Sequence, residues 1–132
     1  MTRKWNLPLT YEPKIQPVID GAIRQTIRAG DKFSEGDSIR FYTWQGTPYR
    51  SKRTTITEYM PLIEVLSLTI HHGGITFPSS LGGEDFALWQ DLDKLAAMDG
   101  IVPPKGFVLR NVLLSKNKLP VPYGLEAQII RW

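Results

Sequence analysis

The chain has 132 residues, of which 42% are hydrophobic and 22% charged; 16 Lys and Arg outnumber 13 Asp and Glu, and there is no cysteine. This length and apolar content predict one domain with its own core, which excludes a wholly disordered protein. The lack of cysteine excludes a disulfide framework, a thiolate nucleophile and a cysteine-ligated zinc site. No apolar run approaches the roughly 18 residues of a membrane span, and no secretory signal follows the basic N-terminus, so a cytoplasmic protein without a membrane partner is expected.

The net charge of +3 is unevenly distributed along the chain. Residues 1–53 hold ten basic and five acidic side chains, a net charge of +5. Residues 54–102 hold one basic and seven acidic side chains, a net charge of −6. Residues 103–132 hold five basic and one acidic side chain, a net +4. Such blocks indicate a basic surface beside an acidic one, although ordinary solvated faces would also fit.

The first half of the chain contains one predicted helix and several predicted strands. After residues 1–9, expected to be an N-terminal extension, Thr10 is placed to cap a helix over residues 11–20 that Gly21 ends. The other elements are extended: a strand over 22–28, and a hairpin with arms over 39–44 and 49–56 around a turn at 45–48.

The middle of the chain holds the strongest strand prediction, residues 62–70, whose nearly continuous apolar character indicates burial on both faces. A shorter strand over 75–77 follows His71 and His72, the two histidines of the chain. Adjacent strand residues point to opposite faces, so these two side chains cannot easily chelate one metal. No metal site and no cofactor are predicted.

The last third switches to helical spacing. Leu88, Leu92 and Leu95 recur at intervals of four and three, and acidic residues gather at the start, so a helix is predicted over 84–98. A short helix after a Pro-Pro pair and a closing strand over 125–132 complete the pattern. These elements favour an α+β fold with a mixed or antiparallel, barrel-like sheet over a doubly wound sheet.

Three side chains of the strand over residues 22–28 form the first candidate binding site. Arg24, Thr26 and Arg28 alternate along the strand and so share one face. Two guanidiniums that flank a hydroxyl would suit a phosphate or a carboxylate. The same row would also simply solvate an exposed strand face.

The predicted hairpin is the second candidate. It interleaves basic and aromatic side chains, a combination that single-stranded nucleic acid binding requires and that an ordinary half-buried hairpin also shows. The members of this cluster are Arg40, Tyr42, Trp44, Tyr49, Arg50, Lys52 and Arg53.

A carboxylate stands where the predicted helix over 84–98 ends. Asp99 opposes the helix dipole there, at a cost of about 0.3–1 kcal/mol when exposed. A residue placed against a local preference is a candidate for function, although a tolerated Asp-Gly turn is the ordinary alternative.

Two stretches, in this order, resemble the ASCH domain, a small member of the PUA-like superfamily. Gly21-Ala-Ile-Arg-Gln-Thr-Ile-Arg28, followed by Gly36-Asp37, is similar to the family's Gly-x-Lys-x-x-Thr-x-Arg segment and Gly-Asp turn. Leu95-Ala-Ala-Met-Asp-Gly-Ile101, with Phe107 beyond it, is similar to the helix end Ala-x-x-(Asp/Glu)-Gly-Phe of bacterial and phage versions. The hairpin and the closing strand fit as well, so the resemblance covers roughly residues 10–132.

The resemblance implies one ASCH/PUA-like domain over residues 1–132, a small β-barrel of mixed or antiparallel strands with two or three peripheral helices. It also implies a cleft that binds RNA or a nucleoside. Some small members remove the acetyl group of 4-acetylcytidine with a Lys, a Thr and a Glu, whose positions correspond to Ile23, Thr26 and Asp99 here. An aliphatic Ile23 cannot activate a hydroxyl, and the neighbouring Arg24 cannot act as a base, so a binding protein is expected rather than an enzyme.

The residues support three functions, of which the first is preferred. The first is binding of RNA or a modified nucleotide, with Arg24 and Arg28 on phosphate or a base edge, Thr26 and Asp99 on a base, and the basic hairpin residues extending the surface. The second is an amidohydrolase acting on an acylated nucleoside, with Thr26 as nucleophile and Asp99 as acid or base. The third is a protein-binding adaptor that docks through the acidic helix over 84–99. The oligomeric state does not follow from the sequence.

Overall fold

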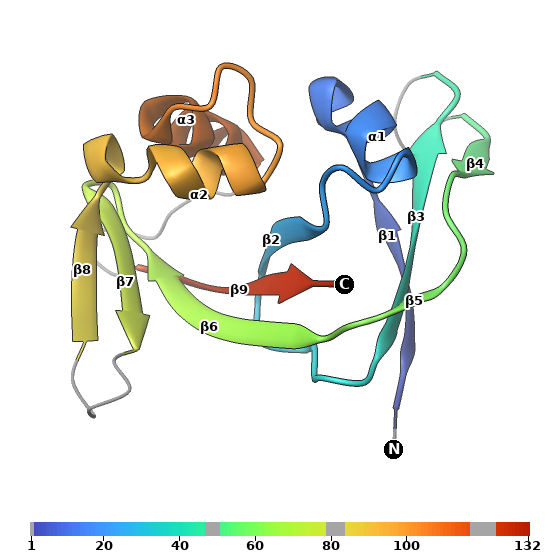
Figure 1. Cartoon of the computed structure of the whole chain (residues 1–132), viewed down its shortest axis with the longest axis horizontal. Coiled ribbons are helices and arrows are strands. Elements are labelled where there is room, and N and C mark those ends of the chain that lie inside the picture. The colour runs from blue at the N-terminus through green and yellow to red at the C-terminus, as the bar shows by residue number, and fades with distance from the viewer. Residues whose placement is uncertain (1, 47–50, 79–83, 117–123) are drawn as a thin grey trace.

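Strands organised in two sheets dominate the fold (Figure 1). The computed structural model describes residues 2–46, 51–78, 84–116 and 124–132, and within these ranges the fold is mixed α+β with three α-helices. Among the described residues no helix is long and apolar enough to cross a membrane.

The first sheet is built around β3 (Ser38–Trp44). β1 (Lys4–Pro8) pairs with it in parallel, while β4 (Arg53–Thr55) and β5 (Met60–Pro61) pair with it antiparallel. The segment expected as an N-terminal extension therefore supplies a strand of this sheet. The pairing of β3 with β4 matches the predicted hairpin, whose turn at 47–50 lies outside the described residues.

The second sheet is antiparallel throughout. Its order is β2 (Gln25–Ala29), β9 (Leu125–Arg131), β6 (Glu64–Ile70), β7 (Gly74–Pro78) and β8 (Glu84–Leu88). β9, the last strand in the chain, pairs with β2 and β6 and so holds early and middle segments together.

Helices cover the sheets at two places (Figure 1). α1 (Glu12–Ile19) lies beside the first sheet, and α2 (Asp93–Met98) and α3 (Gly106–Lys116) lie over the second. α1 begins after Tyr11 rather than at a Thr10 cap, and Gly21 follows its end with a φ of 78°, as a C-terminal glycine should.

The fold has two hydrophobic cores, and strand β9 of the second sheet contributes to both. One core lies between the second sheet and α2–α3 and includes Ile75, Trp89 and Leu109. The other joins the first sheet to α1 through residues such as Phe41 and Val18. A closed barrel would need one shared interior, whereas the described strands form two open sheets, so the expected barrel was wrong.

Residues 84–98 differ most from the sequence prediction. In place of one helix, the chain forms β8, the 3-10 helix η1 (Trp89–Asp91) and α2. β8 pairs with β7 along its whole length, and this long-range pairing overrides the helical spacing of the leucines. The acidic helix over 84–99, on which the adaptor hypothesis depended, is therefore not formed.

β6 is also less buried than predicted. Leu68 and Ile70 belong to the first core, but the side chain of Leu66 is 41% exposed and Ser67 is exposed. The first core covers only the C-terminal end of one face of this strand, and on the other face Val65 is only partly buried against the second core. A nearly continuous apolar run therefore does not mean full burial on both faces.

Candidate ligand-binding cleft

A cleft of about 610 Å³ lies on β2, with α1 on one side and the α2–α3 pair on the other (Figure 1). A volume of this size suits a small organic ligand. The polar side chains that line it come from all of these elements and are Asn6, Thr10, Tyr11, Lys14, Thr26, Arg28, Lys32 and Asp99.

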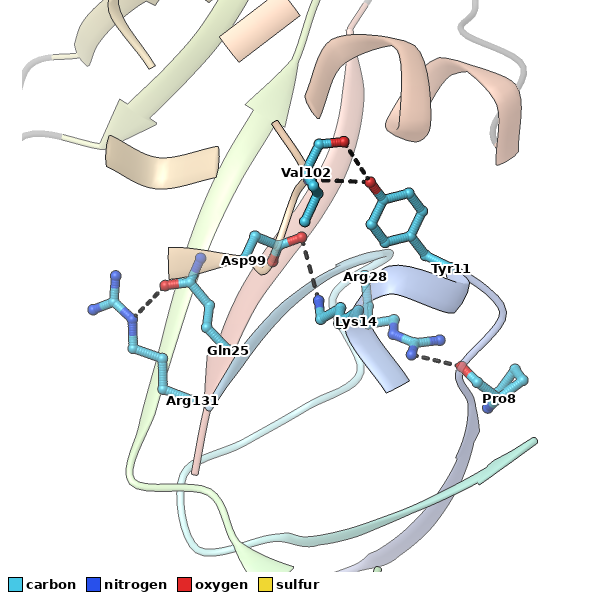
Figure 2. Close-up of polar contacts among 8 residues, drawn as sticks. All are labelled: Pro8, Tyr11, Lys14, Gln25, Arg28, Asp99, Val102 and Arg131. Atoms are coloured by element: carbon cyan, nitrogen blue, oxygen red, sulfur yellow. Dashed lines mark hydrogen bonds and ion pairs between the residues drawn. The ribbon is translucent and has the colours of Figure 1, made fainter. Parts of the chain in front are cut away.

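Lys14 and Asp99 form a buried ion pair in the cleft (Figure 2). Lys14 Nζ lies 3.3 Å from Asp99 Oδ2, and the two side chains are only 3% and 7% exposed. Lys14 comes from the inner face of α1, whereas Asp99 caps the end of α2. The pair therefore joins helices that pack on different sheets.

Gly100 makes this close approach possible. Its φ of 78° turns the chain directly after Asp99, in a conformation that L side chains rarely adopt. A Cβ at this position would lie 3.2 Å from Cγ of Lys14 and from Cγ1 of Ile23. The Asp-Gly pair thus has a structural role as well as a place in the cleft, because it lets Lys14 reach the carboxylate.

Asp99 is buried and its carboxyl is incompletely paired. Burial raises the pKa of this carboxyl above its ordinary value, while Lys14, Gln25 and Arg28 act in the opposite direction. Asp99 Oδ1 and Gln25 Nε2 are both buried, and neither forms a hydrogen bond with another described residue. The Gln25 side chain is oriented by its amide oxygen, because Oε1 accepts a hydrogen bond of 2.9 Å from Arg131 Nε (Figure 2).

Arg28 supplies a second cation to the same space. Its Nη2 donates to the carbonyl oxygen of Pro8 at 2.7 Å, and its guanidinium lies 5.8 Å from the ring centroid of Phe41. Burial lowers the pKa of Arg28 to about 10, against the opposing effects of Asp99 and Tyr42. The side chain therefore stays charged at neutral pH.

Thr26 is a buried residue of β2 whose backbone lies opposite Ile130 of β9. Because alternate strand residues share a face, Thr26 and Arg28 both line the cleft. At its rim, the Tyr11 hydroxyl accepts a bond from Val102 N at 3.1 Å and lies 3.3 Å from Val102 O (Figure 2). These contacts tie the start of α1 to the chain beyond α2.

Two of the three residues of the first candidate site, Thr26 and Arg28, meet the candidate carboxylate Asp99 in this cleft. Arg24 does not line it. It precedes β2, and its Nε donates to the carbonyl oxygen of Trp132 at 2.9 Å, which holds the C-terminal residue in place.

The hairpin residues lie apart from the cleft. Arg40, Trp44 and Arg53 belong to the first sheet and do not line it, and Lys52 precedes β4 and is exposed. Tyr42, also on β3, is buried and does not line the cleft. The remaining two members of that cluster, Tyr49 and Arg50, lie outside the described residues.

Lys14 is the cleft residue that the sequence prediction missed. A signal was present, because Lys14 and Val18 are four residues apart and so share the inner face of α1. A lysine on the buried face of a short helix needs a partner. The family resemblance directed attention to Ile23 instead, whose side chain packs beside Lys14 against Gly100.

The cleft combines the buried cation Lys14, the half-buried Arg28 and the exposed Lys32 with one buried carboxylate and the hydroxyls of Thr10, Tyr11 and Thr26. This set can bind an anionic ligand and hydrogen-bond its polar edges. In the part of the chain that the structure describes, no three His, Asp or Glu side chains converge as metal ligands. The molecule is thus an α+β protein with a polar, cationic cleft.

No family model matches the chain, and neither a curated protein nor a solved structure matches it.

Proposed function

We propose that this protein binds a nucleotide, either free or as part of an RNA, in the cleft on β2. The observation that carries this proposal is the convergence of Lys14, Thr26, Arg28 and Asp99 in one cleft of about 610 Å³. The two stretches that resemble the ASCH domain contribute Thr26, Arg28 and Asp99 to it, which supports the same assignment.

The charges suggest a role for each side chain. Arg28 and Lys14 attract the phosphate, since lining cations outnumber the carboxylate. Asp99 Oδ1, which has no hydrogen-bond partner among the described residues, accepts a bond from a base amino or imino group. Thr26 donates to or accepts from the same base edge.

Calorimetric titration with the four nucleoside 5′-monophosphates tests the proposal. We expect saturable binding of at least one of them, weakened tenfold or more by Arg28→Gln. Arg24→Gln is the matched control, because this arginine lies outside the cleft and bonds to Trp132 O. The proposal fails if no nucleotide binds at millimolar concentration, or if both variants weaken binding equally.

A second candidate is hydrolysis of the amide bond of an acylated nucleoside, and the position of Lys14 favours it. The resemblance places an aliphatic Ile23 where the family has its lysine, yet an amine from α1 enters the cleft that Thr26 lines. Thr26 Oγ1 would add to the carbonyl carbon as its proton passes to Lys14. The C–N bond then breaks, the proton goes to the leaving nitrogen, and water releases the acyl group from Thr26 as the acid.

Lys14 can accept that proton only as a neutral amine. Asp99 is the carboxylate in contact with Lys14, with its Oδ2 3.3 Å from Nζ, and so is the group to which the lysine's proton would pass. Incubation with 4-acetylcytidine followed by chromatography tests the reaction. Product that disappears in Thr26→Val supports hydrolysis, whereas an unchanged substrate with the native protein excludes it.

A further inference from the structure

We propose that the outer face of the first sheet is a second binding surface, for a single-stranded nucleic acid. This inference deepens the proposed function, on which it rests for the nucleotide in the cleft, by naming the kind of chain that carries that nucleotide. The cation–aromatic face consists of the cations Lys4, Arg40 and Arg53 and the half-buried rings of Trp44 and Tyr59, with the buried ring of Tyr42 beneath Arg53.

The strand register places these side chains together. Alternate residues of β3 share a face, so Arg40, Tyr42 and Trp44 form a line along it. Across the β1–β3 pair Asn6 lies opposite Arg40, and across the β3–β4 pair Arg53 lies opposite Trp44. The intervening β3 residues, Ile39 and Phe41, point the other way into the second core.

At one end of the face, two cations flank a tyrosine. The Arg40 guanidinium carbon lies 4.4 Å from the Tyr59 ring centroid, and Lys4 Nζ lies 5.0 Å from the same centroid. Asn6 Oδ1 accepts a bond of 3.0 Å from Arg40 Nε and orients the guanidinium. A guanidinium plane held in this way is a stacking surface for a nucleic-acid base.

At the other end, Arg53 lies over two rings that contact each other. Its guanidinium carbon is 4.5 Å from the Tyr42 centroid and 5.2 Å from the Trp44 centroid. The two rings meet edge to face, with centroids 5.5 Å apart. Arg53 itself is exposed and can contact a phosphate while it stays over these rings.

The chemistry of the face matches a single strand of nucleic acid better than an acidic protein. No outward-facing position of the described strands of this sheet carries a carboxylate, so the three cations act together. Cations alternate with rings, and a single strand alternates phosphates with unpaired bases that can stack. An acidic peptide would use the cations and leave the rings without a role.

The face continues into the cleft across strand β1. Asn6 and Pro8 line the cleft, and each also binds an arginine: Asn6 Oδ1 accepts from Arg40, while Pro8 O accepts from Arg28 inside the cleft. A chain with one nucleotide in the cleft can therefore pass over β1 onto the cation–aromatic face.

Fluorescence anisotropy with a fluorescein-labelled, mixed-sequence single-stranded RNA of ten nucleotides tests this inference. We expect Arg40→Gln/Arg53→Gln to weaken RNA binding about tenfold or more, and to reduce the slope of log K against log salt by about 0.7 per phosphate contact removed. Tyr59→Leu, which keeps the charge and removes a ring, is also expected to weaken RNA binding. Mononucleotide binding in the cleft should remain unchanged in both variants.

The matched control is Arg24→Gln/Arg110→Gln, which removes the same charge from arginines that bond to Trp132 O and His72 O away from this face. The inference is overturned if this control weakens RNA binding as much as the face variant does. It is also overturned if duplex RNA or polyglutamate binds as tightly as the single strand, or if the RNA binds no tighter than a mononucleotide. Face-dependent RNA binding without any mononucleotide binding would overturn the cleft assignment and leave the face assigned.

Discussion

Lys14 and Asp99 stabilise the fold only as a pair. Each side chain is buried, and a buried charge that loses its partner is far more costly than an exposed one. The pair also joins α1 to the end of α2, so it links the helices on the two sides of the cleft. A ligand that contacts either group acts on an interaction that the fold itself needs.

Lys14→Met should therefore destabilise the protein strongly. The substitution keeps a long apolar side chain but leaves the Asp99 carboxylate buried without its cation. We expect the free energy of unfolding at pH 7 to fall by about 3–5 kcal/mol, as measured by urea denaturation.

The control for Lys14→Met is the double variant Lys14→Met/Asp99→Asn, which removes the uncompensated charge and should lose less stability than the single variant. The loss of unfolding free energy in Lys14→Met should also become smaller as the pH falls. A carboxyl with a raised folded-state pKa takes up its proton in the folded state first, and this favours folding in acid. Equal losses in both variants at every pH would contradict the assignment of a buried, charged pair.

The pKa of the Asp37 carboxyl is shifted downward, in the opposite direction from that of Asp99. Its carboxylate accepts bonds from Trp5 Nε1 at 3.0 Å, Arg3 N at 2.9 Å and Ser34 N at 3.1 Å, which tie β1 to the turn before β3. The bond from Trp5 is the largest cause that lowers the pKa of Asp37. A lowered folded-state pKa contributes stability above the unfolded value of 3.8, and this stability is lost as the pH falls through the folded value.

Asp37→Asn should consequently destabilise the protein by about 1–3 kcal/mol at neutral pH, and the difference from the native protein should narrow below about pH 4. Urea unfolding at a series of pH values measures both effects. Asp31→Asn, at an exposed aspartate, should change little. If the difference in unfolding free energy between Asp37→Asn and the native protein stayed constant down to pH 2, the charge of the Asp37 carboxylate would not contribute to stability.

At the scale of elements, helix and strand types were mostly predictable, but the segment 84–98 was not. Leu92 and Leu95 do belong to the helical part, while Leu88 ends a strand that hydrogen-bonds to β7. The residues of β8, Glu84 to Leu88, are two acidic residues followed by three apolar ones, and they show no polar–apolar alternation that would predict a strand. The strand forms because β7 is there to pair with it, and sequence periodicity does not contain that information.

Two adjacent glycines test the strand assignment of residues 84–88. A Cβ on Gly74 would lie 2.0 Å from the carbonyl oxygen of Ala87 in β8, whereas a Cβ on Gly73 would meet only the Phe86 ring at an ordinary 3.8 Å. Gly74→Ala should force β7 and β8 apart and lower the free energy of unfolding by about 2–4 kcal/mol. Gly73→Ala should change it by less than about 0.5 kcal/mol. Urea denaturation measures both changes. Equal losses of stability in the two variants would contradict the pairing of β8 with β7.

The whole molecule depends on pairings that lie far apart in the sequence. Thr26, Arg28 and Asp99 were each predicted from a local pattern in the sequence. They come together only because β2 pairs with β9 and α2 packs over the second sheet. A closed barrel was predicted because the number of expected strands allowed one. The sequence pattern alone does not show that successive residues of β9 serve different cores, with Ile129 in one and Ile130 in the other.

This sharing of β9 predicts that the two cores unfold together. Strand alternation sends Ile129 and Ile130 to opposite faces, so neither core can lose its part of β9 without disturbing the other. Trp89 reports on the first core and Trp132 on the second. In Trp89→Phe the core tryptophans that remain are Trp5 and Trp132, both of the second core, and in Trp5→Phe/Trp132→Phe the core tryptophan that remains is Trp89.

Within each variant, urea unfolding followed by tryptophan fluorescence and by far-ultraviolet circular dichroism should give one coincident midpoint, as expected for a two-state domain. Saturating mononucleotide should shift that midpoint without splitting it, because the cleft is lined by Lys14 from the helix beside the first sheet and by Asp99 from the helix over the second. At 100 times its Kd, such a ligand adds about 2.7 kcal/mol. Two separate transitions would mean that the sheets are independent units and that the cleft between their helices is not a preformed site.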